Sequence, residues 1–320
     1  MRSTATDTHI KNPGTIPEEA RSSGDDSRAE AMRLTGRNYT KVRHLLVQQP
    51  RGSATRTSTL GIMVASRKHR ALLLYLLLLT LWPGVLKNRR EPLEGPTWAR
   101  LLSTETSGMA WTPSDVSRAW GDLERLHLIE RTRQGRALQV KPRREDGKKP
   151  WTDPGLVRSN REETYFILPG AFWTDHLFAE LSLGELAMLL IIAAETSKDD
   201  EVHLTAEQVH DWYGISASTA KKGFNDLVQR GLANRRVDYV KAPLSSTGTT
   251  AHHYYSLTGS YSSGARAAAR QKAAQAAEKR RSQSGSERTA KKIKDKTTSK
   301  ASRPKRSVAH PTTGGGETTS

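Results

Sequence analysis

Two stretches of this chain, residues 112–131 and residues 216–235, follow the same pattern 104 positions apart. Each begins with a hydroxyl residue, carries apolar side chains at helical spacing, contains an Asp-Leu step and ends on arginine. Each therefore predicts a capped amphipathic helix that runs into a basic strand. A duplicated unit constrains the fold more than any single motif, because both copies must bury the same apolar face.

Capping residues mark where these helices begin. Thr112 and Asp115 form a T-x-x-D capping box for the first copy, and Ser216 is the corresponding cap of the second. Thr205 and Gln208 predict a further capping box on the helix before it. We expect the large aromatic side chains on the inward helical stripes to be core residues rather than base-stacking platforms: Trp98, Trp120, Trp212 and Phe224.

The longest apolar run, Ala71 to Trp82, has twelve residues and ends before a proline. A membrane-spanning helix needs about 20 apolar residues, so this run predicts a buried core helix. The N-terminus has no apolar segment of the kind found in signal peptides. We therefore expect a soluble, cytoplasmic protein that does not associate with membranes.

The same order of elements is expected twice: three helices, a strand, a loop and a strand. The strand sequences repeat as well, since RALQVKP (136–142) resembles RVDYVKAP (236–243) and YFILPG (165–170) resembles YYSLTG (254–259). The sequence predicts a mainly α fold with small β-hairpins (α+β). Its expected parts are a disordered polar arm (1–58), two domains (63–173 and 181–261) and a disordered basic tail (262–320).

Charge indicates the kind of partner. The chain has 51 Lys and Arg against 33 Asp and Glu, a net charge of +18, and no cysteine. A balance this basic is typical of proteins that bind nucleic acid. The tail alone carries fifteen basic and four acidic residues, so we expect it to contact phosphates without sequence preference. The absence of cysteine excludes disulfides and thiolate metal sites.

The outward side chains of the repeated helices are the candidate base readers. In the second copy they combine hydroxyl, amide and ammonium groups suited to base edges: Ser218, Thr219, Lys221, Lys222 and Asn225. In the first copy they are Ser114, Ser117 and Arg118, interleaved with the acids Asp115 and Asp122. The second helix is therefore expected to read DNA better. Basic residues of the following strands are expected to approach the DNA backbone or the minor groove: Arg131, Arg133, Arg136, Arg235, Arg236 and Lys241.

Signatures of catalysis are missing from the sequence. It contains no G-x-x-x-x-G-K-[ST] phosphate loop, no H-E-x-x-H and no G-x-S-x-G. His252 and His253 are adjacent in an expected strand, so they point to opposite faces and cannot easily share a metal ion. We expect a protein that is not an enzyme and that needs no cofactor or metal.

With these caps, helices and basic strands, the chain resembles the winged helix-turn-helix superfamily of DNA-binding proteins. The likeness is strongest at YGISASTAKKGFNDLVQRGL, residues 213–232, which is similar to the reading helix of many bacterial transcription regulators. The paired arrangement also resembles tandem winged-helix proteins of actinobacteria. The resemblance covers roughly residues 63–261 and implies two tandem winged helix-turn-helix domains.

The resemblance leaves three roles open. The leading expectation is a sequence-specific transcription regulator that binds double-stranded DNA in the nucleoid, mainly through the second domain. A plasmid-type replication initiator that binds repeated origin sites is the alternative. The third is a winged-helix module that binds other proteins without specific DNA binding. Two reading units in one chain can cover two half-sites, so both a monomer and a homodimer remain open.

Overall fold

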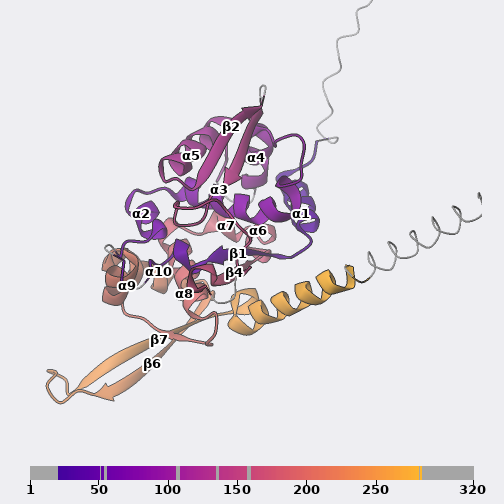
Figure 1. Ribbon diagram of the computed structural model, residues 1–320. Coiled ribbons are helices and arrows are strands. Elements are labelled where there is room, and N and C mark those ends of the chain that lie inside the picture. The colour runs from indigo at the N-terminus through magenta and orange to yellow at the C-terminus, as the bar shows by residue number, and fades with distance from the viewer. Residues whose placement is uncertain are drawn as a thin grey trace, which may run out of the picture. The chain divides into compact units, whose positions relative to one another are not determined.

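The apolar run forms α3 (His69–Leu81), around which the other helices of the N-terminal half pack. Every side chain from Ala71 to Leu81 is buried, as expected for a helix that is apolar on all sides. In the computed structural model α3 lies in the middle of the helices α1, α4 and α5 (Figure 1). The apolar segment His69–Leu86 is the one candidate membrane span among the described residues, and 61% of it is buried within the protein. The prediction of a buried core helix is thus confirmed, and it supports a soluble protein.

The structure describes residues 21–280 and residue 282, except residue 51 and residues 54–55, 106–108, 135–136 and 157–159. The chain divides into two units, residues 1–271 and 272–320. All the elements named below lie in the first unit, apart from the end of a C-terminal helix over residues 263–280. The expected disorder of residues 1–20 and 283–320 lies outside the described residues, whereas residues 263–280, which were expected to be disordered with the rest of the tail, form a helix.

The N-terminal half consists of α3 and the elements packed around it. A π-helical turn continues α3 at Pro83, and a short β-hairpin follows α5. The elements are α1 (Gly24–Thr35), α2 (Thr59–Ala65), α3, the π-helical turn Trp82–Leu86, α4 (Gly95–Leu102), α5 (Pro113–Arg125), β2 (Ile129–Gln134) and β3 (Ala137–Pro142).

Two sequence predictions for this half are wrong. Residues 24–46 are not a disordered arm, because α1, β1 (Tyr39–Arg43) and a 3-10 turn (His44–Leu46) place Met32, Val42 and Leu46 in the core. The expected outer strand of the first repeat, β4 (Tyr165–Pro169), pairs with β1 and not with the basic strand. The basic stretch instead folds back on itself as the β2–β3 hairpin. The two copies therefore differ in how their strands pair.

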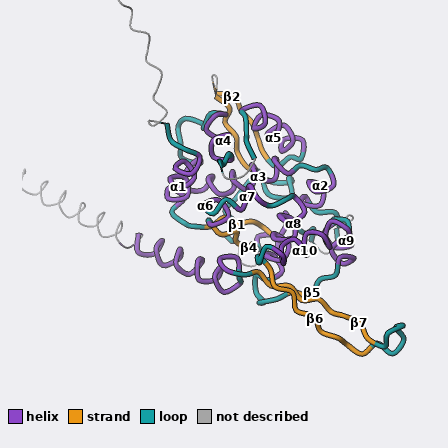
Figure 2. Tube along the Cα trace, turned by 180° about the vertical axis from the view of Figure 1, so that it is seen from behind, coloured by secondary structure: helices purple, strands orange, loops and turns teal. Residues whose placement is uncertain are grey.

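The C-terminal half has one more strand than the repeat predicts. The short strand β5 precedes α9 and pairs with β7, so the sheet order is β5-β7-β6. The β6–β7 hairpin projects from the rest of the unit (Figure 2). The elements are a 3-10 turn (Arg161–Glu163), α6 (Ala171–Thr174), α7 (Leu177–Glu180), α8 (Leu183–Glu195), β5 (Val202–His203), α9 (Ala206–Tyr213), α10 (Ala217–Gln229), β6 (Ala233–Lys241), β7 (Thr249–Leu257) and the 3-10 turn Gly259–Tyr261.

Both halves share one hydrophobic core, which runs from α3 through β4 into α8 and α10. Polar contacts also cross between them. Ser58 Oγ caps α2 and donates to the Tyr213 carbonyl oxygen at 3.1 Å, and His44 Nε2 lies 3.1 Å from the Ala194 carbonyl oxygen. Gly61 lies so close to α9 that a Cβ on it would be 2.3 Å from the Tyr213 oxygen. The predicted boundary between two domains thus does not separate two cores.

Local predictions at the helix starts are confirmed. The Thr112–Asp115 and Thr205–Gln208 capping boxes are both formed, and the Ser216 hydroxyl caps α10. Three of the four expected core aromatics, Trp98, Trp120 and Phe224, are buried. Trp212 is only partly buried, and the neighbouring Tyr213 takes its place inside the protein.

Candidate nucleic-acid interface

The turn between α9 and α10 fixes the angle at which α10 leaves the core. It comprises Gly214, Ile215 and Ser216. Gly214 has φ +73°, the left-handed conformation that ends α9, and a Cβ there would lie 2.9 Å from Thr57. Ile215 is buried and Ser216 caps the next helix. A three-residue turn with glycine is typical of the helix-turn-helix.

One face of α10 packs against α8 at very short range. Gly223 makes this approach feasible, because a Cβ there would lie 2.7 Å from Met188 and 2.8 Å from the Gly184 carbonyl oxygen. Phe224 is buried beside it and stacks on Tyr255 with ring centroids 4.2 Å apart. The opposite face of α10 is therefore left to solvent, and it carries the exposed side chains of Ser218, Lys221 and Lys222.

Most of the predicted readers on α10 have partners within the protein, and those of Lys222 and Thr219 lie on the helix itself and at its cap. Lys222 Nζ lies 2.6 Å from Asp226 Oδ2, one helical turn further along, and this hydrogen bond raises the pKa of the Lys222 ammonium. Thr219 is partly buried, and its hydroxyl lies 2.8 Å from the Ser216 hydroxyl. Lys222 is still 76% exposed, so a phosphate or base edge can compete with Asp226 for it.

A hydrogen bond connects the exposed face of α10 to the hairpin. Arg235 on β6 donates from a guanidinium nitrogen to Asn225 Oδ1 on α10 at 3.0 Å. Both residues were predicted to contact DNA, and the structure brings them together. The bond holds the start of the hairpin beside the middle of the helix, so the two elements form one continuous surface.

The neighbouring Arg236 points to the other face of the sheet, as alternation along a strand requires. Its guanidinium binds the carboxylates of Glu201 and Asp238 and lies 4.3 Å from the Tyr254 ring centroid. The hydrogen bonds to Glu201 and then Asp238 raise the pKa of Arg236. The structure therefore separates Arg236 from the surface that Arg235 shares with α10. Lys241 is exposed near the hairpin tip.

The first-copy residues lie on a different surface, on α5 and the β2–β3 hairpin. Ser114, Ser117 and Arg118 are exposed on α5, while Arg118 pairs with Asp115 at 2.8 Å. Arg131 pairs with Glu124 on α5, and Arg133 is exposed on β2. Arg136 lies outside the described residues.

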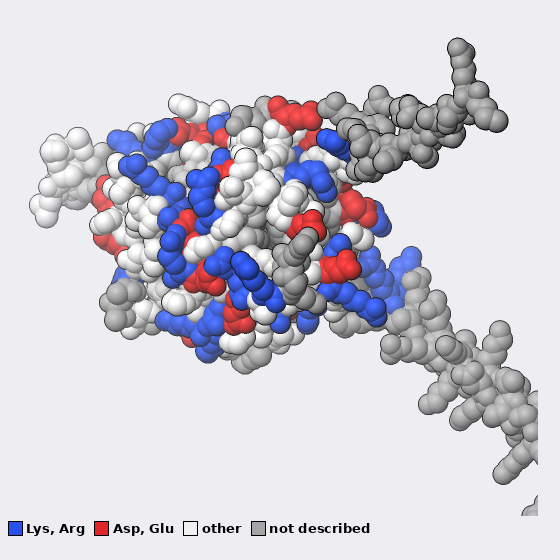
Figure 3. All heavy atoms as spheres, turned by 90° about the horizontal axis from the view of Figure 1, so that it is seen from above, with Lys and Arg blue, Asp and Glu red and all other residues white. Residues whose placement is uncertain are grey.

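The acidic side chains of α5 also pair with basic side chains at the start of α3, which the sequence analysis did not predict. Lys68 Nζ lies 3.0 Å from Asp122, and Arg70 lies 2.6 Å from Asp115. With Arg67 these residues line an open hollow between the start of α3 and α5. On the face that carries α4 and α5, basic and acidic side chains are interspersed (Figure 3). The signal for this cluster was the basic run RKHR at 67–70, just before the apolar helix.

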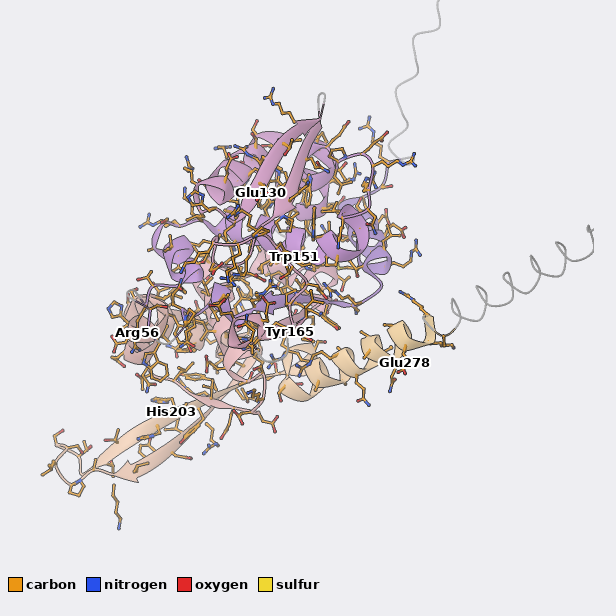
Figure 4. All side chains as sticks on the ribbon, viewed as in Figure 1. Arg56, Glu130, Trp151, Tyr165, His203 and Glu278 are labelled. Atoms are coloured by element: carbon orange, nitrogen blue, oxygen red, sulfur yellow. The ribbon has the colours of Figure 1, made fainter. Side chains whose placement is uncertain are left out.

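His203 lies where the hairpin leaves the rest of the unit, next to two further histidines on β7 (Figure 4). His203 on β5 stacks on His252 of β7 with ring centroids 4.6 Å apart, and it also contacts the Tyr254 ring. Burial, followed by the charge of the two neighbouring histidines, lowers the pKa of His203. Among the described residues no group of three or more His, Cys, Asp or Glu side chains is arranged to hold a metal ion.

Comparisons with known proteins do not assign a family. No protein-family model, no curated protein and no solved structure matches this chain. The geometry of α10 and the β6–β7 hairpin therefore carries the functional argument.

Proposed function

We propose that this protein binds double-stranded DNA through α10 and the β6–β7 hairpin, as a sequence-specific transcription regulator of the nucleoid. The observation that carries the proposal is the Asn225–Arg235 hydrogen bond, which joins an exposed helix to a basic hairpin as one surface. A helix of this kind fits the major groove, where lysine, serine and asparagine recognise base edges. In this proposal Arg235 and Lys241 on the hairpin contact the DNA backbone.

The order of elements supports a winged helix in the C-terminal half. α8, β5, α9, α10, β6 and β7 follow one another with the sheet order β5-β7-β6. In this assignment α9 and α10 are the helix-turn-helix, α10 is the reading helix and the hairpin is the wing. The free N–H groups at the start of α10 add a favourable environment for a phosphate.

The N-terminal half supports a second, divergent winged helix in the proposed tandem. α3, α4 and α5 correspond to α8, α9 and α10, and β2–β3 corresponds to the wing. On α5, however, Asp115 and Asp122 hold Arg70, Arg118, Lys68 and Arg125 in ion pairs. These pairs reduce the charge available to phosphate, so we assign this half a supporting role on the backbone.

The proposal is tested by selecting bound fragments from random or genomic DNA with the full-length protein. A sequence-specific regulator enriches a motif, and the double variant Lys222→Ala, Asn225→Ala weakens binding to that motif by about 1–3 kcal/mol for each base that is no longer recognised. Lys198→Ala, an exposed lysine in the loop after α8, is the matched control and leaves the motif preference unchanged.

Two other results of this selection would indicate different roles. Enriched motifs arranged as direct repeats at an origin indicate a replication initiator. Weak binding that moderate salt abolishes, with no enriched motif, contradicts the proposal and indicates a protein-binding module.

A further inference from the structure

The outer end of the β6–β7 hairpin gathers large apolar side chains in solvent. Six large hydrophobic side chains are exposed among the described residues, and three of them, Tyr239, Val240 and Leu244, lie within this end. Tyr239 is 75% exposed and Leu244 is fully exposed. Single exposed apolar residues are common on protein surfaces, but three within the six residues 239–244 at the end of a projecting element point to an interaction site.

Hydrogen bonds hold the tip in a defined shape. The Ala242 amide donates to the Gly248 oxygen at 2.9 Å, and the Ser245 amide donates to the Ala242 oxygen at 2.9 Å. The Ser245 hydroxyl donates to the same Ala242 oxygen, and Gly248 adopts φ +69° to close the turn. Leu244 is therefore presented to solvent by an ordered turn.

Nothing in the fold of the described residues covers these side chains. β5 pairs with β7 only at Tyr254 and Tyr255, so the hairpin beyond that point has two strands and no third neighbour. Two-stranded hairpins are marginally stable by themselves, and uncovered apolar side chains add nothing to the stability of this one. The exposed apolar side chains of the tip are thus best explained by a binding partner.

The position of the tip indicates what it contacts. Arg235, Val237 and Tyr239 are two residues apart along β6, so their side chains lie on the same face of the hairpin. Tyr239 therefore points to the same side as the α10 surface. A strand rises about 3.3 Å per residue, which puts Lys241, the last residue of β6, roughly 20 Å beyond Arg235, and the turn with Leu244 lies further out. The tip therefore reaches beyond the major groove that α10 occupies, which is about 12 Å wide. Lys241 supplies positive charge next to the tip, and Asp238, the one acid of the hairpin, pairs with Arg236.

We propose that the hairpin tip, chiefly Leu244 and Tyr239, is a wedge that inserts between base steps of the duplex bound by α10 and kinks it. This proposal rests on the proposed DNA binding. Apolar side chains inserted from the minor groove partly unstack a base step and bend the duplex by about 20–90°. Lys241, the basic residue next to the wedge, adds a phosphate contact beside the deformed step.

The test uses the full-length protein and a mixed-sequence duplex of about 30 base pairs, close to three turns of B-DNA, at low salt and labelled with a donor and an acceptor at its ends. A second duplex carries 2-aminopurine, whose fluorescence rises on unstacking. The wild type is expected to shorten the end-to-end distance and to raise the 2-aminopurine signal. Leu244→Ser and Tyr239→Ser should remove both changes, while the Kd rises by less than about ten-fold because the phosphate contacts remain.

Two controls separate the wedge from charge and from folding. Lys241→Ala should weaken binding and lower the salt slope by about 0.9 while the kink stays. Ser246→Ala, an exposed position in the same turn, should change nothing. The Tm of Leu244→Ser should equal that of the wild type, because the side chain is in solvent.

The failures are distinguishable. A wild type that binds the duplex without bending or unstacking it overturns the wedge and leaves the proposed function standing. A wild type that does not bind the duplex overturns both. Unchanged bending in Leu244→Ser overturns the wedge, and if sedimentation then shows that this variant no longer forms a dimer seen in the wild type, the tip is a protein contact.

Discussion

Arg43 is a fully buried charge whose guanidinium has three partners in the N-terminal half. It lies 2.9 Å from Glu145 and 2.8 Å from Glu163, and it donates to the Thr152 carbonyl oxygen at 2.9 Å. Glu145 is also fully buried. Arg43 therefore connects β1 to the long segment between β3 and β4. Its positive charge and the negative charges of the two glutamates offset the free-energy cost of burying one another.

Removing Arg43 should leave Glu145 buried and unpaired. We expect Arg43→Met to lower the free energy of unfolding by about 3–5 kcal/mol, measured by urea denaturation. The matched control is Arg33→Met, which breaks the exposed pair with Glu30 and should cost less than about 1 kcal/mol. An equal loss of unfolding free energy in both variants would show that the buried ion pairs stabilise the protein no more than an exposed pair does.

Asp226 should oppose DNA binding through its pair with Lys222. We expect Asp226→Asn to tighten binding to every duplex, because the change frees Lys222 and removes a negative charge beside the phosphates. Kd should also depend more steeply on salt: the slope of log Kd against log salt should rise by up to about 0.9, which corresponds to one further phosphate neutralised. Fluorescence anisotropy at several salt concentrations measures both quantities, and a weaker or unchanged affinity would place α10 away from the phosphates.

At the scale of elements, helices were predictable and strand partners were not. α5 and α10 carry their caps and apolar stripes within the local sequence, so their starts were predicted to the residue. β1 is five residues long, and its partner β4 lies more than a hundred residues later, so no local pattern marks the pair. Asn225 and Arg235 were likewise each predicted as DNA-contacting residues. The hydrogen bond between them was not predicted, because it depends on how the hairpin packs against α10.

The capping box of α5 makes its first turn sensitive to acid. Hydrogen bonds from the Thr112 amide and hydroxyl lower the pKa of Asp115 to about 2. In the unfolded chain the value is about 3.9, so the unfolded state takes up this proton first as the pH falls. The stabilisation is complete above pH of about 4 and is lost towards pH 2.

Thermal unfolding between pH 6 and pH 2 tests this. Asp115→Asn should be less stable than the wild type at pH 6 and should converge with it as the pH approaches 2. Asp199→Asn, in the exposed loop after α8, controls for the change of charge. Parallel curves for Asp115→Asn and the wild type over this range would contradict the assigned role of Asp115.

At the scale of the whole molecule, the two halves that the sequence repeat predicts share one hydrophobic core. A fragment of residues 63–173 lacks β1, the partner of β4, and lacks the Ser58 cap of α2. A fragment of residues 181–261 lacks Arg266, which is buried and donates to the Ala193 and Thr196 carbonyl oxygens at the end of α8. We therefore expect neither fragment to fold, and we expect residues 21–280 to unfold in a single calorimetric transition. Two resolved transitions, or a folded short fragment, would show independent domains.

Arg266 also determines how the role of the basic tail must be tested. Deleting residues 262–320 removes Arg266 together with the tail, so a loss of stability would be confounded with a loss of phosphate binding. Deleting residues 281–320 keeps Arg266 and still removes ten basic and three acidic residues. We expect this shorter deletion to leave the Tm unchanged and to weaken binding to all duplexes alike. The slope of log Kd against log salt should fall by about 0.9 for each phosphate that the tail neutralises.

The longer deletion is the comparison that separates the two effects. It should reproduce the change in salt slope and in addition lower the Tm, because the carbonyl groups at the end of α8 lose their donor. Arg266→Met in the full-length chain should lower the Tm without changing the slope. An unchanged slope after deletion of 281–320 would mean that the tail makes no contact with DNA, and that the positive charge used for binding lies on α10 and the hairpin.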